Sequence, residues 1–203
     1  MKIQLRLNST YLAYLFGGVL LLGAGVSAFM TKDLRWMNWH FSRLGEGGTL
    51  SSVIFNVAVF VSAIIMFYLS YALSDDTAHI TKITSVNLIK ARAIINRAFN
   101  AVAICLIGVS LFPFDRFPMI HDFFGYSMLF IFLALCITTQ KVLPIYSRQF
   151  YLYCNLIILS TVVCYTLFFG LKVITLLTVE FILFTFLYVW LIYFIKGIRE
   201  TNA

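Results

Sequence analysis

The chain has 203 residues, of which 62% are apolar and only 11% are charged, and its mean hydropathy is +0.94. Soluble domains are about 45–50% apolar and about 25% charged. A soluble domain of this length could not bury so much apolar surface, which excludes a soluble enzyme, a disordered chain and a disulfide scaffold. The composition indicates a polytopic membrane protein, in which the net charge of +7 reports on orientation rather than on nucleic acid.

Six apolar stretches follow one another along the chain, each long enough to cross a bilayer as a helix of about 20 residues. None has the period-two alternation of a barrel strand. The sequence therefore predicts an all-α fold, in which residues 1–203 form a single transmembrane domain with six helices in an antiparallel bundle. The predicted spans are residues 11–30, 51–73, 94–112, 123–139, 150–169 and 173–195. We expect the longest connection, residues 74–100, to be a basic, partly amphipathic segment that lies at the inner membrane surface and runs into the third helix.

Basic residues are divided unequally between the two faces of this bundle. Ten of the fifteen Lys and Arg residues fall on the side that carries both termini, and five fall on the other side. The positive-inside rule then predicts that both termini are cytoplasmic and that the protein is a multi-pass protein of the cell inner membrane.

Most polar residues that could form a site lie on the opposite, extracytoplasmic side, in residues 36–48 and 113–122. The second and sixth helices run inward, so Asn56 and Glu180 are expected about 8 Å and about 10 Å below their outer ends. Topology therefore gathers Ser42, Arg43, Glu46, Asn56, Asp115, Arg116, His121, Asp122 and Glu180 in one leaflet.

Glu180 is the most informative of these residues, because an ionisable side chain inside a span costs roughly 2.5–3.5 kcal/mol on insertion scales. Three interpretations stay open for it. It is a structural partner of Arg43, Arg116 or an outer hydroxyl, it belongs to a ligand or proton site, or it is a protonated carboxyl that faces lipid.

Several chemistries could use the outer residues. His40 and His121 are weak candidates for metal ligands, but the sequence has no H-x-x-x-H or H-E-x-x-H spacing, and we expect no metal and no cofactor. Ser42 could be a nucleophile, with His121, Asp122 or Glu180 as acid or base. The simplest alternative is that these groups only attach two loops to the helix bundle.

Two outer motifs resemble a known family. The first is the run HFSRLGE over residues 40–46, followed after a Gly-rich spacer by IFN over residues 54–56. The second runs from Gly108 to Phe112-Pro113 and Asp115, with His121 after it. Both are similar to the six-helix prokaryotic membrane proteins catalogued as domain of unknown function 998, which are related to the Frag/DRAM/Sfk membrane proteins. The resemblance implies six helices, internal termini, a polar outer site and, by analogy with distant relatives, lipid handling.

These arguments lead to one expected function and two alternatives. We expect a lipid-handling or accessory membrane protein whose partners are membrane lipids and not nucleic acid. The expected headgroup site consists of Arg43, Glu46, Asn56, Asp115, Arg116 and His121, with the two arginines on the phosphate. The first alternative is an intramembrane hydrolase or acyl transferase that uses Ser42 and His121 with acidic partners. The second is a small-solute transporter.

Overall fold

The computed structural model describes residues 8–81, 86–142 and 146–200, and over these residues the fold is all-α. Every long helix is apolar enough to cross a membrane, which confirms the predicted six-helix membrane fold. The helices are α1 (Ser9–Met30), α2 (Leu50–Thr81), α3 (Val86–Leu111), α4 (Pro118–Val142), α5 (Arg148–Tyr165) and α6 (Leu176–Glu200).

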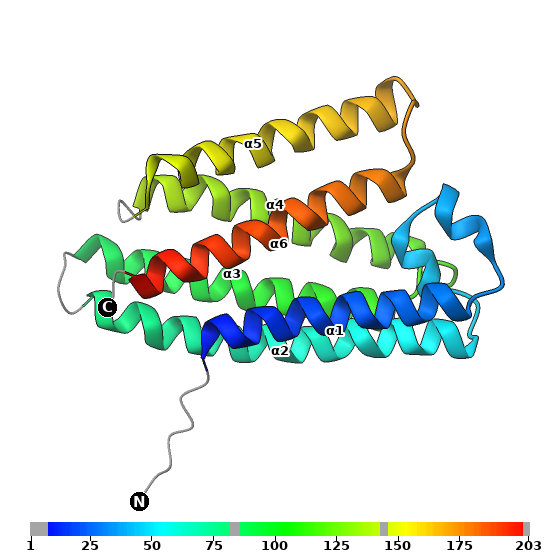
Figure 1. The fold of residues 1–203 in the computed structure, drawn as a ribbon, viewed down its shortest axis with the longest axis horizontal. Helices are drawn as coiled ribbons and strands as arrows, with labels where there is room; N and C mark the ends of the chain where they lie inside the picture. The colour runs from blue at the N-terminus through cyan, green and yellow to red at the C-terminus, as the bar shows by residue number, and fades with distance from the viewer. Residues whose placement is uncertain (1–7, 82–85, 143–145, 201–203) are drawn as a thin grey trace, which may run out of the picture.

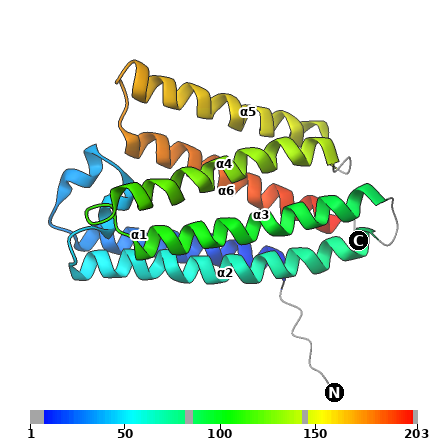
Figure 2. The same cartoon turned by 180° about the vertical axis from the view of Figure 1, so that it is seen from behind.

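Consecutive helices are antiparallel neighbours, and α6 returns to pack against α1, as Figure 1 shows. α5 lies at the edge of the bundle, in contact with α4 and α6 (Figures 1 and 2). The two described chain ends lie together, because Arg199 near the end of α6 donates hydrogen bonds to the side chains of Asn8 and Thr10. We call this the terminal end of the bundle. The opposite end, which carries residues 31–49, 112–117 and 171–175, is the loop end.

The basic segment over residues 74–100 extends the second and third helices beyond the expected spans of residues 51–73 and 94–112. α2 continues to Thr81 and α3 begins at Val86, so most of this segment is helical. The 32 residues of α2 give a helix of roughly 48 Å, well beyond a hydrocarbon core of about 30 Å. The extension is possible because a helix satisfies its own backbone groups in water as well as in lipid. Arg92 also ties the two extensions together, since its Nη2 donates to Ser74 Oγ at 2.9 Å.

Small residues allow the first two helices to approach closely. A Cβ placed on Gly23 of α1 would lie 2.0 Å from the Cβ of Ala58 on α2, so only glycine fits at this crossing. Close backbone approach through small residues is a general means of helix association in lipid, where apolar burial supplies little driving force. Gly23 therefore lets α1 and α2 pack closely against each other.

Aromatic side chains fill the core on the other side of the bundle. Trp190 and Phe194 of α6 are fully buried and stack at 5.0 Å between ring centroids. Phe99 of α3 stacks on Phe194, and Phe150 of α5 packs against Trp190. This aromatic core connects α6 to α3 and α5 near the terminal end.

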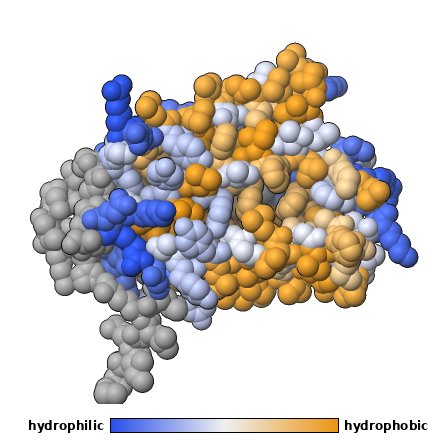
Figure 3. Space-filling view, viewed as in Figure 1, coloured by the Kyte–Doolittle hydropathy of each residue, from blue (hydrophilic) through white to orange (hydrophobic). Residues whose placement is uncertain are grey.

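The surface follows the pattern of a membrane-spanning bundle. In Figure 3, hydrophobic residues cover the middle of this face, and hydrophilic residues gather toward both ends. Large apolar side chains such as Phe130, Leu159 and Phe181 are more than half exposed. A lipid environment accounts for this exposure, because the hydrocarbon core would cover the apolar middle.

Candidate functional site

Two short 3-10 helices, η1 (Leu34–Asn38) and η2 (Phe41–Gly45), fold over the loop end of the bundle. Asp33 begins η1, since its Oδ1 accepts hydrogen bonds from the backbone N–H and the Nε of Arg35. The guanidinium of Arg35 holds the pKa of the Asp33 carboxyl well below its usual range. This turn is therefore held by a carboxylate that stays charged at neutral pH.

Helix α6 fixes the middle of this loop. Glu180 Oε2 accepts a short hydrogen bond from the backbone N–H of Phe41, and the N–H of Leu177 donates to the carbonyl of Trp39 at 2.8 Å. This hydrogen bond corresponds to the first of the three interpretations of Glu180, that of a structural partner. Its partner is a backbone amide rather than Arg43, Arg116 or a hydroxyl.

Helices α1 and α2 fix the end of the same loop. Asn56 Nδ2 donates to the carbonyl of Gly45 at 2.9 Å, and Ser27 Oγ donates to the carbonyl of Leu44. A Cβ on Gly45 would lie 2.4 Å from Asn56 Oδ1, so glycine is needed here for the amide to reach the backbone. Asn56 therefore lies at the loop end, as its place in the second span predicted, and its observed contact is with the loop backbone.

Three polar side chains of the loop lie in a row. Ser42 Oγ is 2.9 Å from Nδ1 of His40, and Nε2 of His40 is 3.6 Å from Oε1 of Glu46. His40 is only 7% exposed, so the row is largely shielded from solvent. The arrangement brings a hydroxyl, an imidazole and a carboxylate together. The histidine beside Ser42 is therefore His40, and the expected Ser42–His121 pairing is not present.

His121 has a different environment. Its Nδ1 contacts the carbonyl oxygen of Phe112 at 2.9 Å, which joins the start of α4 to the end of α3. The ring of Phe114 lies between the two histidines, with its centroid 4.8 Å from that of His40 and 5.9 Å from that of His121. Asp122 next to His121 is exposed and has no hydrogen bond or ion pair among the described residues.

Arg43 is surrounded by opposite charge. Its guanidinium nitrogens lie 3.7 Å from Glu46 Oε2 and 3.7 Å from Asp33 Oδ2. Its Cζ lies 4.5 Å from the ring centroid of Trp39, a cation–π geometry. The side chain is 13% exposed. Arg43 is therefore the centre of a small charged cluster, and two carboxylates already neutralise it.

Arg116 lies beside a glycine turn. The preceding residue, Asp115, accepts a hydrogen bond from the N–H of Gly47 at 3.1 Å, which joins the two outer loops. Gly47 and Gly48 have φ angles of +81° and +64°, a conformation that favours glycine. A Cβ on Gly48 would lie 3.5 Å from Nη2 of Arg116, so the guanidinium lies against this turn. Arg116 is exposed and has no ion pair within the described ranges.

Unsatisfied polar atoms concentrate at this one place. Five buried side-chain N or O atoms of the described residues lack a hydrogen-bond partner, and four belong to the loop. They are Trp36 Nε1, His40 Nε2, Arg43 Nε and Glu46 Oε1. Buried polar groups are normally hydrogen-bonded, so such a concentration calls for a water, a ligand or a functional role.

Burial also shifts two pKa values in the cluster. It lowers the pKa of His40 to about 4, helped by the nearby His121 and Arg43. Burial raises the pKa of the Glu46 carboxyl, against the opposing effect of Arg43. His40 is therefore neutral at pH 7, which lets its ring accept a proton from Ser42 or donate one toward Glu46.

The site contains no grouping of the kind that binds metals. Across the described residues, no three His, Cys, Asp or Glu side chains could hold an ion together. His40 and His121, the weak candidates, are separated by the Phe114 ring.

The polar cluster lies on the loops where the sequence gathered candidate residues, and it has members that the sequence did not indicate. Asp33, Trp36 and Trp39 are not among the expected site residues, although each contributes a charge, a donor or a ring to the cluster. The His-x-Ser spacing of His40 and Ser42 was the available signal for their contact.

Comparison with known proteins found no matching family model, no matching curated protein and no matching solved structure.

Proposed function

We propose that this multi-pass membrane protein handles lipids of the cell inner membrane, and that its loop end binds a phosphate-containing headgroup at the extracytoplasmic leaflet. The proposal rests on the buried polar atoms of the loop that have no hydrogen-bond partner. Two of them, Trp36 Nε1 and Arg43 Nε, are N–H donors, and an anionic oxygen is the partner that such donors lack.

Arg116 provides the charge for this headgroup. Arg43 is already paired with two carboxylates, whereas Arg116 is exposed and unpaired among the described residues. Arg116 also lies against Gly48, two residues before α2 begins at Leu50. The N-terminus of a helix favours anions, so a phosphate here would interact with both the guanidinium and the helix dipole.

The membrane location supports the same proposal. Ten basic residues on the side of the termini favour a cytoplasmic terminal end, which leaves the loop end outside. Trp39 is about half exposed beside Arg43, as expected of an interfacial aromatic residue. The resemblance of the two outer motifs to a family with lipid-handling relatives agrees with this proposal.

A binding measurement tests the proposal. Purified protein in detergent is titrated with a short-chain phosphatidylglycerol by isothermal calorimetry, using wild type, Arg116→Gln and Lys172→Gln. Lys172 is the control because it is an exposed cation at the same end that forms no hydrogen bond or ion pair among the described residues. We expect Arg116→Gln to weaken binding about tenfold, the effect of one lost charged hydrogen bond, and Lys172→Gln to have little effect. Equal affinities for all three proteins would refute the proposal.

One observation favours a second candidate, a hydrolase or acyl transferase. The Ser42–His40–Glu46 row has the order nucleophile, base and carboxylate found in acyl-transfer sites. Here Nδ1 of the neutral His40 would accept the Ser42 proton, and Glu46 would stabilise the imidazolium. In this version the catalytic histidine is His40 and not His121.

Covalent labelling tests this candidate. A lipophilic fluorophosphonate should modify Ser42 in wild-type protein, and His40→Gln should abolish the modification while Ser110→Ala leaves it unchanged. Absence of label on Ser42 in folded protein would rule out the enzyme.

A further inference from the structure

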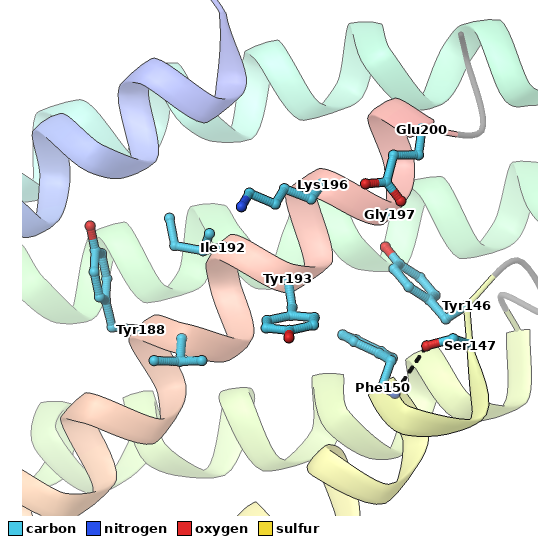
Figure 4. A pocket seen from close by; sticks show the side chains of 10 residues that line it. Tyr146, Ser147, Phe150, Tyr188, Ile192, Tyr193, Lys196, Gly197 and Glu200 are labelled. Atoms are coloured by element: carbon cyan, nitrogen blue, oxygen red, sulfur yellow. Dashed lines mark hydrogen bonds between the residues drawn. The ribbon is translucent and has the colours of Figure 1, made fainter.

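A cavity of about 610 Å³ lies at the terminal end, away from the loop cluster (Figure 4). It lies along α6 and is flanked by the start of α5. Ligand pockets typically have volumes of about 300–1,000 Å³. The cavity is therefore large enough for a headgroup with part of an acyl chain.

One stripe of α6 forms the floor of this cavity. Tyr188, Ile192, Lys196 and Glu200 line it at intervals of four residues, so their side chains form one continuous ridge along the helix. The stripe is roughly 18 Å long at 1.5 Å per residue. Its two charged residues, Lys196 and Glu200, lie toward the end of α6, and Ile192 lies farther from that end. The cavity is thus polar at the membrane surface and apolar below it.

The walls are rigid aromatic rings. Tyr146 and Phe150 stack at 4.1 Å between centroids, and the hydroxyl of Tyr146 donates to the carbonyl of Phe194 at 2.7 Å. A Cβ on Gly197 would lie 2.2 Å from the Tyr146 ring, so this glycine lets the ring pack against α6. The cavity is therefore preformed by packed side chains, which limits the ordering cost of a ligand.

Two unpaired opposite charges lie at the polar end. Lys196 and Glu200 are both exposed, and neither forms an ion pair or hydrogen bond within the described part of the chain. Figure 4 shows the Lys196 amine turned along α6 toward Ile192, away from the Glu200 carboxylate. The order Lys then Glu at four residues is the less favourable orientation for a helical ion pair. Both charges are thus available to a ligand.

We propose that this cavity binds an ethanolamine glycerophospholipid of the leaflet at the terminal end. Lys196 holds the phosphate, Glu200 holds the ammonium, and the acyl chain lies along Ile192 and the ring of Tyr193. A zwitterionic headgroup matches one free cation and one free anion, whereas a purely anionic headgroup would leave the carboxylate facing like charge. The proposal is independent of the outer site.

Native mass spectrometry of the full-length protein measures this binding with dioleoyl phosphatidylethanolamine and, separately, dioleoyl phosphatidylglycerol. All variants are made in the Arg116→Gln background, so that the proposed outer site does not contribute. We expect Lys196→Gln to reduce the bound ethanolamine lipid at least tenfold. Glu200→Gln should reduce the ethanolamine lipid but not the glycerol lipid. Arg148→Gln is the matched control, because Arg148 is an exposed cation at the same end that does not line the cavity.

Three results would overturn the proposal. Unchanged binding in Lys196→Gln would show that the cavity does not hold the phosphate. An equal effect of Glu200→Gln on both lipids would refute the zwitterionic headgroup. Ile192→Trp, which fills the apolar part of the cavity, should reduce binding of both lipids, and unchanged binding would refute the acyl-chain position.

Discussion

Acidification should open the loop over residues 33–48, because this loop buries a neutral histidine. His40 is 7% exposed, and burial lowers its pKa from the ordinary value of 6.5 to about 4. When the loop opens, the imidazole regains water and its ordinary pKa. The open state then binds more protons than the closed state, so closing becomes less favourable as the pH falls below about 6.5.

The size of this effect follows from the two pKa values. A pH of 5.5 is one unit below the pKa of His40 in the open loop, so the open-state histidine is mostly protonated. The closed-state histidine is still neutral at this pH. The contribution of His40 to the free energy of loop closing therefore falls by about 1.4 kcal/mol between pH 7.5 and 5.5. This change shifts the equilibrium between open and closed loop about tenfold toward the open state. The loss continues until the pH reaches about 4. Glu46 acts in the opposite direction, since its raised pKa favours the closed loop in acid.

Amide hydrogen exchange of the loop peptides in nanodiscs measures this opening, after correction for the intrinsic pH dependence of exchange. Wild-type protection factors should fall about tenfold between pH 7.5 and 5.5, while those of the α2 and α3 cores stay constant. His40→Gln should remove the pH dependence, and His121→Gln measures the contribution of the second histidine. The reasoning is refuted if wild type and His40→Gln lose protection equally.

Substitutions at four positions test the packing and the loop anchors through thermal unfolding in detergent. Gly23→Ala should destabilise the protein by about 1–3 kcal/mol, because its Cβ would overlap α2, whereas Gly25→Ala on the same helix meets no atom within 4 Å and should be neutral or stabilising. If both variants behave alike, the helix crossing is not tight. Glu180→Ala should cost about 1–3 kcal/mol, because it leaves the N–H of Phe41 without an acceptor, while Glu180→Gln keeps an acceptor and should cost less; equal losses would contradict this contact. Lys172→Gly should raise stability by about 0.5–1 kcal/mol, because Lys172 has a φ of +54°, and a lower melting temperature would contradict that strain.

The helices were predictable because the bilayer leaves few alternatives. Apolar runs of sufficient length must be helical in lipid, so six spans could be recognised without any knowledge of packing. The segment over residues 74–100 was harder, because polarity marks the edge of the hydrocarbon and not the end of a helix. Charged residues such as Arg92 are good helix formers, and α2 and α3 therefore continue past the expected span ends.

The location of the polar site was predictable from topology, but its contacts were not. Alternating helix directions place residues 36–48 beside residues 113–122, which is how Asp115 reaches the N–H of Gly47. The partner of Ser42 depends on the path of two 3-10 turns, and these turns put His40 beside it instead of His121. The acceptor role of Glu180 toward a backbone amide could not be found from residue types, because a backbone amide leaves no mark in the sequence.

The central claim, that a phosphate headgroup binds at the loop end, is tested most directly by photocrosslinking. A phospholipid with a photoreactive group on its phosphate-linked headgroup is reconstituted with the protein, and the labelled peptides are identified by mass spectrometry. We predict label on residues 36–49 and 113–117, lost on competition with phosphatidylglycerol and about tenfold weaker in Arg116→Gln. Label confined to the lipid-facing surfaces of the helices, unchanged in Arg116→Gln, would contradict the claim.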